Sequence, residues 1–175
     1  GTTPLSLMDM SEREGEVPGT MVNSLRHPLG THENGNDLDI AYYQTDGSNN
    51  GQTICPDDGQ FCTSPPTILD APRTAYFMAK LFTHPETRVI GVDTMIAPPL
   101  QAAADSLLSQ GLITSAQRNA FYTEMAFGSG WPFHQHHMHF SWNFESGWWF
   151  TGPPQGCQSM PSVVDVPKTL AFPPR

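Results

Sequence analysis

The sequence is 175 residues long, which is enough for one domain, and it is acidic. Eight Lys and Arg against 17 Asp and Glu give a formal net charge of −9, which argues against nucleic acid or an anionic membrane surface as a partner. No segment approaches the roughly 18 consecutive apolar residues of a membrane-spanning helix. Seventeen Pro and 15 Gly predict a loop-rich fold, while ten Phe and eight Met supply side chains for a core. We therefore expect a globular protein with no membrane span and no nucleic-acid partner.

The composition divides the chain into a central domain and two peripheral ends. Residues 1–20 combine Gly, Pro and Thr with a charge cluster and predict an irregular N-terminal arm. Residues 21–150 form the predicted domain, and residues 151–175 a Pro-rich C-terminal tail. The sequence begins with Gly1 and shows no basic segment followed by an apolar one. We therefore expect any signal peptide to have been removed already or to lie outside this sequence.

The first half of the domain predicts one strand, one long loop and one helix. Apolar residues alternate along the predicted strand 38–43. Residues 44–67 are rich in Gly, Pro, Asn and Asp and predict a long loop, which in a compact domain is usually functional or tied down. Asp70 as N-cap and Pro72 in the first turn predict a helix that ends before His84.

The second half predicts another strand and two more helices. A short strand is expected at 88–92 and a helix at 100–110. A third helix, capped by Thr114 or Ser115, is expected to end near Phe127. Strands and helices alternate without a regular βαβ period. The predicted fold class is therefore α+β, with a small antiparallel sheet flanked by helices and long irregular loops.

Three cysteines bear on the cellular compartment. Cys55 and Cys62 enclose a short, turn-rich segment, so a disulfide between them is plausible and would indicate an oxidising compartment. The alternative is three reduced thiols in a cytosolic protein. Cys157 is the odd one, either free or paired with a partner.

A histidine cluster is the strongest chemical signal. Four of the seven histidines lie within six residues: His134, His136, His137 and His139. On a strand, alternation places His137 and His139 on one face and the apolar residues between and after them on the other. Two imidazoles on one face, backed by apolar residues, are typical of a metal site. Two other histidines, His27 and His84, each precede a proline and predict ordinary polar loop residues.

A second cluster strengthens the metal interpretation. His32 and Asp39 are separated by Gly35, which allows a tight turn and lets His32 approach Asp39 at the start of a strand. These two residues and one histidine of the first cluster make a three-ligand set. Zinc accepts imidazole and carboxylate, and a catalytic site leaves the fourth position to a water whose pKa falls to about 7. The remaining histidines suit proton transfer.

The two clusters together resemble a family. The pattern His32-x-x-Gly35-x-Asp37-x-Asp39, followed later by His134-x-x-His137-x-His139, resembles the penicillin-insensitive murein endopeptidases. These belong to a wider group of zinc peptidases with D-Ala-D-Ala peptidases, lysostaphin-type enzymes and the hedgehog domain. The resemblance implies that His32, Asp39 and His139 are zinc ligands.

The resemblance also implies roles for neighbouring residues. His137 would lie beside the metal as general base or oxyanion stabiliser, and His134 would assist it. Asp37 would have a structural or ligand-orienting role. His136 has no counterpart in the family and is expected to point away from His137. Ser141 departs from the family, which commonly has a basic residue at this position.

The expected function follows from this resemblance. The protein would be a periplasmic or secreted zinc peptidase that hydrolyses peptide cross-links of bacterial peptidoglycan through a metal-activated water. One alternative is a non-catalytic, hedgehog-like zinc domain for protein interaction. Another is a metallo-amidase acting on a non-murein peptide. The sequence leaves the oligomeric state open.

Overall fold

A computed structural model describes residues 3–11, 16–19 and 27–143. Its helices and strands follow one another in this order: β1 (Asp37–Ala41), α1 (Ala71–Phe82), β2 (Thr87–Gly91), α2 (Ala97–Ser109), α3 (Ser115–Thr123), β3 (Met125–Ala126) and β4 (His137–Trp142). The predicted C-terminal tail and Cys157 lie outside the described residues. None of the helices in these ranges is both long and apolar enough to cross a membrane.

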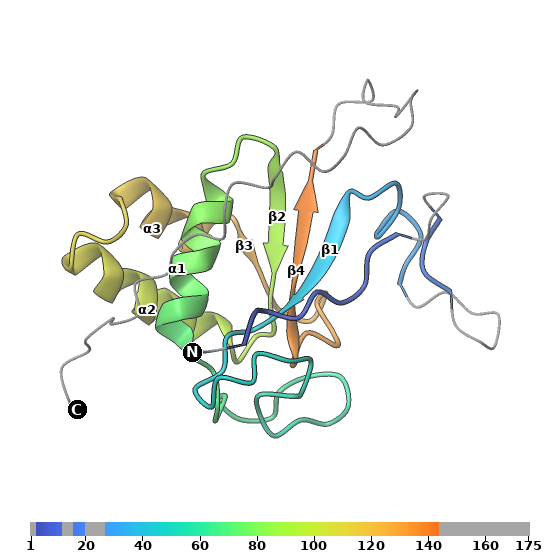
Figure 1. Cartoon of the computed structure of the whole chain (residues 1–175), viewed down its shortest axis with the longest axis horizontal. Coiled ribbons are helices and arrows are strands. Elements are labelled where there is room, and N and C mark those ends of the chain that lie inside the picture. Colours follow the sequence, from blue (N-terminus) through green and yellow to red (C-terminus); the bar gives the residue numbers. More distant parts are fainter. Residues whose placement is uncertain (1–2, 12–15, 20–26, 144–175) are drawn as a thin grey trace.

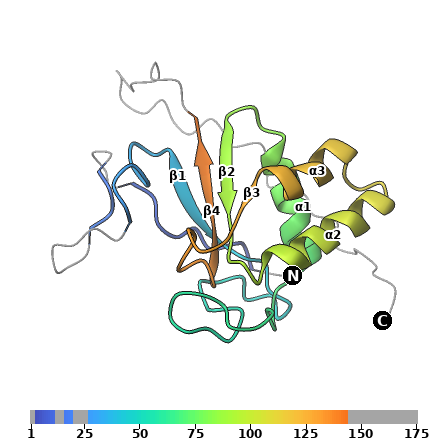
Figure 2. The same ribbon diagram turned by 180° about the vertical axis from the view of Figure 1, so that it is seen from behind.

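The strands form one four-stranded sheet in the order β1-β4-β2-β3. Strand β4 pairs antiparallel with β1 and with β2, whereas β3 pairs parallel with β2. The predicted α+β class is confirmed, and the sheet is mixed rather than wholly antiparallel. The helices lie together beside β2 and β3, and the long loop that follows β1 lies at one end of the strands (Figures 1 and 2).

Helix boundaries follow the local capping signals. The Asp70 side chain accepts a hydrogen bond from the backbone N–H of Arg73, as an N-cap does. Thr114 and Gln117 form a reciprocal capping box at the start of α3. The prediction that this helix ends near residue 127 was wrong, because Met125 and Ala126 leave it to pair with β2.

The two faces of the sheet have different partners. Leu38 and Ile40 of β1, with Met138 and Phe140 of β4, belong to the buried apolar core that includes the helices. The alternate residues of the same strands are polar and also buried: Asp37, Asp39, His137, His139 and Ser141. The predicted alternation in β4 is therefore confirmed, and it gives the polar residues a face of their own.

The N-terminal arm lies against the outer edge of β1. The backbone N–H of Met8 donates to the Asp39 carbonyl at 2.8 Å, and the Asp39 N–H donates to the Asp9 carbonyl at 2.9 Å. A third bond joins the Ala41 N–H to the Ser6 carbonyl at 3.0 Å. This segment therefore covers the edge of the sheet that β1 would otherwise expose.

The long loop is tied down by the predicted disulfide. Cys55 and Cys62 are bonded, with their Cα atoms 5.7 Å apart. The loop also contacts the histidine segment, because the Ile54 N–H donates to the Gln135 carbonyl and the Phe133 N–H to the Gln60 carbonyl. The long loop, which the disulfide closes, is thus hydrogen-bonded to the segment that leads into β4.

Candidate metal centre

Strand register brings the predicted ligands together. In the antiparallel pair β1–β4, Asp39 lies directly opposite His139 and Asp37 directly opposite Ser141. Residues that face each other across an antiparallel pair share one side of the sheet and have closely spaced side chains. The His139 Nδ1 and Asp39 Oδ1 atoms are accordingly 3.1 Å apart.

His32 joins them from the turn before β1. Its backbone has a φ of 53°, in the left-handed region that is uncommon for residues with a side chain. The His32 N–H donates to Asp37 Oδ2 at 2.9 Å, and the side chain is fully buried. Backbone strain of this kind concentrates at functional sites, where surrounding contacts hold it in place.

Three ligand atoms converge at this point. His32 Nε2 lies 3.1 Å from His139 Nδ1 and 3.4 Å from Asp39 Oδ1. A tetrahedral ion with bonds of about 2.0–2.1 Å sets its ligand atoms roughly 3.3 Å apart. Two imidazole nitrogens and a carboxylate oxygen with these separations fit three vertices of such a tetrahedron.

His27 lies beside the same carboxylate. His27, His32 and Asp39 form a group that can hold a metal ion, with one ligand atom from each within 4.8 Å of the others. The His27 ring stacks on the His32 ring with centroids 3.7 Å apart. The prediction of an ordinary loop residue missed this contact, and the only sequence signal was the closeness of His27 to His32 in the chain.

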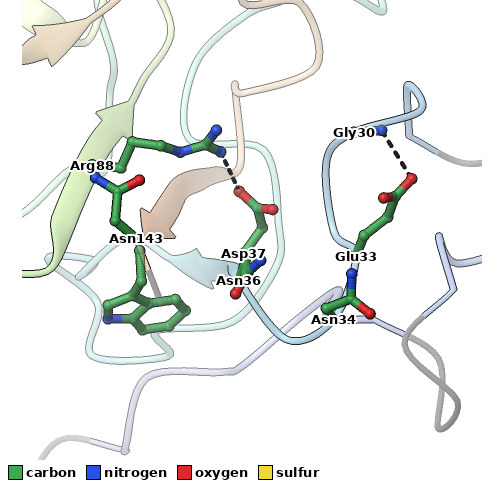
Figure 3. A pocket seen from close by; sticks show the side chains of 8 residues that line it. Gly30, Glu33, Asn34, Asn36, Asp37, Arg88 and Asn143 are labelled. Atoms are coloured by element: carbon green, nitrogen blue, oxygen red, sulfur yellow. Dashed lines mark hydrogen bonds and ion pairs between the residues drawn. The ribbon is translucent and has the colours of Figure 1, made fainter. Parts of the chain in front are cut away.

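A second layer of residues holds His139 in place. The other ring nitrogen of His139, Nε2, lies 3.0 Å from Asp37 Oδ1 and 3.1 Å from Ser141 Oγ. Arg88 of β2 donates from Nη2 to Asp37 at 3.1 Å (Figure 3). The same nitrogen donates to Ser141 Oγ at 2.7 Å. A carboxylate behind a ligand histidine fixes the ring and its tautomer, which is the ligand-orienting arrangement expected for Asp37.

The two buried carboxylates give the site a strong preference for positive charge. Burial opposes ionisation of Asp37 and Asp39, but hydrogen bonds with the site histidines outweigh it and lower both pKa values, that of Asp37 to about 2. Burial likewise disfavours a charged His139, yet its bonds to Asp37 and Asp39 raise its pKa to about 9. Without a metal, the cation between the carboxylates is the His139 imidazolium.

His137 and His134 lie on the same side of the sheet. His137 Nε2 is 3.3 Å from Asp39 Oδ2, and its Nδ1 is buried without a hydrogen-bond partner among the described residues. Burial, with the neighbouring histidines, lowers the pKa of His137 to about 3, so this ring is neutral at pH 7. His134 packs against His137 with ring centroids 4.8 Å apart, and its Nδ1 donates to the Pro132 carbonyl at 2.7 Å.

His136 is placed differently from the prediction. Its ring contacts that of His137, with centroids 4.5 Å apart, and it lines the same cleft. The expectation that it points away assumed strand alternation at this position. Strand β4 begins only at His137, so alternation does not govern the residue before it.

A cleft of about 670 Å³ opens over the ligands. Its polar lining comes from the site residues, while Trp131, Phe133 and Met8 contribute apolar surface. The Trp131 ring packs over Gly91, where any Cβ would overlap it. The volume is in the range of sites for small molecules and short peptide segments.

A smaller polar pocket of about 160 Å³ lies near Arg88 and Asp37 (Figure 3). Arg88 lines both this pocket and the larger cleft. Sequence reasoning missed Arg88, because its role depends on the register of β2 against β4. The structure places this basic side chain beside Ser141, the residue at which the sequence departs from the pattern of the resembled family.

Comparisons with known protein families, curated proteins and solved structures find no match. The resemblance to murein endopeptidases therefore depends on the motif residues alone.

Proposed function

We propose that this protein is a zinc-dependent peptidase that hydrolyses peptide cross-links of bacterial peptidoglycan. The observation that carries the proposal is the convergence of His32 Nε2, Asp39 Oδ1 and His139 Nδ1 at separations of 3.1–3.4 Å. Three protein ligands leave a tetrahedral ion one position for a water or a substrate, which is typical of catalytic rather than structural zinc.

The donor chemistry favours zinc among the divalent ions. Imidazole nitrogens with one carboxylate suit zinc, whereas Mg²⁺ and Ca²⁺ prefer sites made of oxygen atoms. When bound, zinc lowers the pKa of a coordinated water to about 7 and polarises a carbonyl oxygen. Asp37 supports the ligand set by holding His139 Nε2, so that Nδ1 faces the metal position.

His137 is the proposed catalytic residue beside the ligands. A neutral imidazole donates a hydrogen bond from one nitrogen and accepts a proton at the other. His137 Nε2 already faces Asp39, so a donated bond there can stabilise negative charge that develops near the metal position. His134 supports this role by packing against the His137 ring, with its own tautomer fixed by the Pro132 carbonyl.

The cleft is consistent with a peptide substrate. Trp131 and Phe133 offer apolar surface beside the ligands, which suits short aliphatic side chains. The choice of murein comes from the family resemblance. The Cys55–Cys62 disulfide supports the proposed periplasmic or secreted location, because disulfides persist in oxidising compartments.

A non-catalytic zinc domain of hedgehog type is the second candidate, and one observation favours it. His27 is close enough to the ligand set to form a metal-binding group with His32 and Asp39. Four protein ligands would close the site, as in structural zinc centres. A metallo-amidase acting on a non-murein peptide would use the same geometry as the leading proposal and differs from it only in substrate.

The test combines metal analysis with digestion of purified murein. We expect one zinc per chain in the wild type, release of peptide fragments from murein, and loss of both in His139→Ala. His84→Ala, which changes an exposed histidine outside the site, is the matched control and should behave as the wild type. Zinc binding without hydrolysis of any peptide would instead support the interaction domain. Hydrolysis of peptides but not of murein would support the amidase.

A further inference from the structure

We propose that His27 is an exchangeable fourth ligand of the metal centre, which Asp9 of the N-terminal arm holds away from the metal. The inference concerns regulation of the proposed zinc site and depends on that site. It assigns a function to the arm, which the proposed peptidase mechanism does not use.

His27 lies close to the proposed ligands His32 and Asp39. Its Nε2 atom lies 3.9 Å from Oδ2 of Asp39, the second oxygen of the proposed ligand carboxylate, and His27, His32 and Asp39 each offer a ligand atom within 4.8 Å of the others. Its ring is already stacked on the ligand His32. Nε2 would join the ligand set by rotation of the His27 side chain away from Asp9.

Asp9 pairs with the His27 atom that would bind the metal. In the structure, His27 Nε2 is 2.9 Å from Asp9 Oδ2. The same nitrogen cannot donate a proton to Asp9 and bind a metal, because metal binding needs its lone pair. Asp9 and the metal therefore compete for one atom.

The arm holds Asp9 in a fixed register with the metal site. The Asp9 carbonyl accepts a hydrogen bond from the backbone N–H of Asp39, itself a proposed ligand. Asp9 and His27 both line the cleft that lies over the ligands. Asp9, which competes with the metal for His27, is thus hydrogen-bonded through its backbone to the strand that carries Asp39.

This arrangement gives the centre two states. With His27 bound to Asp9, three protein ligands leave one position open to water or substrate. With His27 on the metal, the centre has four protein ligands and excludes both. A small ligand that enters the cleft must then compete with His27.

Two variants of the whole chain test the exchange in opposite directions. His27→Phe keeps a ring to stack on His32 but has no donor atom, so Zn²⁺ affinity should fall about tenfold or more, as for other losses around a metal site. Asp9→Asn replaces the carboxylate that holds His27, so Zn²⁺ affinity should rise several-fold. Affinity is measured by competition with a chelator, and His84→Phe is the matched control.

Co²⁺-substituted protein supplies a readout that does not depend on activity. Binding of acetohydroxamate, followed by the visible Co²⁺ absorption, should tighten in His27→Phe and weaken in Asp9→Asn. His27→Gln serves as a second variant if the Phe side chain disturbs folding, which circular dichroism of the metal-free proteins checks. The Co²⁺ spectrum itself should shift in opposite directions in the two principal variants.

Three results would overturn the inference. Affinities and spectra within twofold of the wild type in both variants would show that His27 never binds the metal. A loss of affinity in Asp9→Asn equal to that in His27→Phe would show that Asp9 supports the centre rather than competing with it. A wild-type protein that binds neither Zn²⁺ nor Co²⁺ would overturn the proposed function as well, whereas the first two results leave it standing.

Discussion

The β1–β4 pair is buried on both faces, but different interactions stabilise the residues on each face. On one face, Leu38 and Phe140 pack into the apolar core, where burial itself is favourable. On the other, Asp39 and His139 are equally inaccessible, yet burial of charge is costly unless a partner offsets it. The apolar face therefore needs no ligand, whereas the polar face gains stability from a cation. The difference predicts that substitutions one residue apart have unlike consequences.

The largest expected effect is the loss of the proposed zinc in His139→Ala. This change removes the Nδ1 ligand atom and leaves Asp39 without its opposite partner in the sheet. Zinc should be absent after gel filtration in the presence of a weak chelator, and hydrolysis should be abolished. Full zinc occupancy in a variant that remains folded by circular dichroism would show that the ligand assignment is wrong.

The neighbouring residue on the other face should affect stability instead. Phe140→Ala removes a buried ring from the core and should lower the free energy of unfolding by about 3–5 kcal/mol. The folded fraction should still bind one zinc per chain. Urea unfolding of the metal-free proteins measures the first quantity and zinc titration the second. A loss below about 1 kcal/mol would contradict the position of Phe140 in the core.

The third prediction concerns His137, which lies on the polar face but is not a proposed ligand. His137→Ala should keep zinc and fold while lowering turnover by about a hundredfold or more, the usual range for a lost proton-transfer group. His137→Gln retains a hydrogen-bond donor but cannot carry a proton between two nitrogens. Partial activity in the Gln variant would therefore indicate charge stabilisation, and equal loss in both would indicate proton transfer. Unchanged rates in both variants would remove His137 from the mechanism.

Much of this two-faced arrangement could be predicted from the sequence. Alternation in residues 137–142 gave the faces of β4, and capping signals at Asp70 and Thr114 placed the starts of two helices. Such features depend on residues close together in the chain, so local patterns are sufficient to predict them.

The contacts that complete the centre could not be predicted in this way. Arg88 reaches Asp37 only because β2 pairs with β4 in one register, and that register is decided by packing of distant segments. His27 meets the ligands through the turn before β1 and through Asp9 of the arm. Strand β3 has only two residues, too few for any periodic signal.

The fourth prediction tests the second layer behind the ligands. Asp37→Asn should weaken zinc binding by about 10–100-fold, the usual cost of losing a carboxylate behind a ligand histidine. Arg88→Met should have a smaller effect, because Arg88 acts on His139 only through Asp37 and Ser141. Asp105→Asn is a matched control, since Asp105 pairs with Arg118 at an exposed position outside the site. An Asp37→Asn affinity equal to that of this control would contradict the proposed orienting role.

The last prediction, the sharpest test of the charge argument, is that the stability of the metal-free protein and its affinity for zinc change in opposite directions with pH. Asp37 and Asp39 raise the pKa of His139 to about 9 in the metal-free protein, above its ordinary value of 6.5. A raised pKa in the folded state contributes stability that is complete below pH 6.5 and is lost as the pH rises towards 9. The melting temperature of the metal-free protein should therefore fall over this interval.

Zinc binding should change in the other direction over the same interval. The metal must displace the proton from His139, so the apparent affinity should rise by up to tenfold per pH unit and level off near pH 9. Asp37→Asn removes one of the two carboxylates that stabilise the imidazolium, so both slopes should become shallower. Melting curves and chelator competition between pH 6.5 and 9.5 measure the two trends. The proposal that zinc replaces the proton of the His139 imidazolium would be wrong if melting temperature and zinc affinity changed in the same direction with pH. It would also be wrong if Asp37→Asn left both pH dependences unchanged.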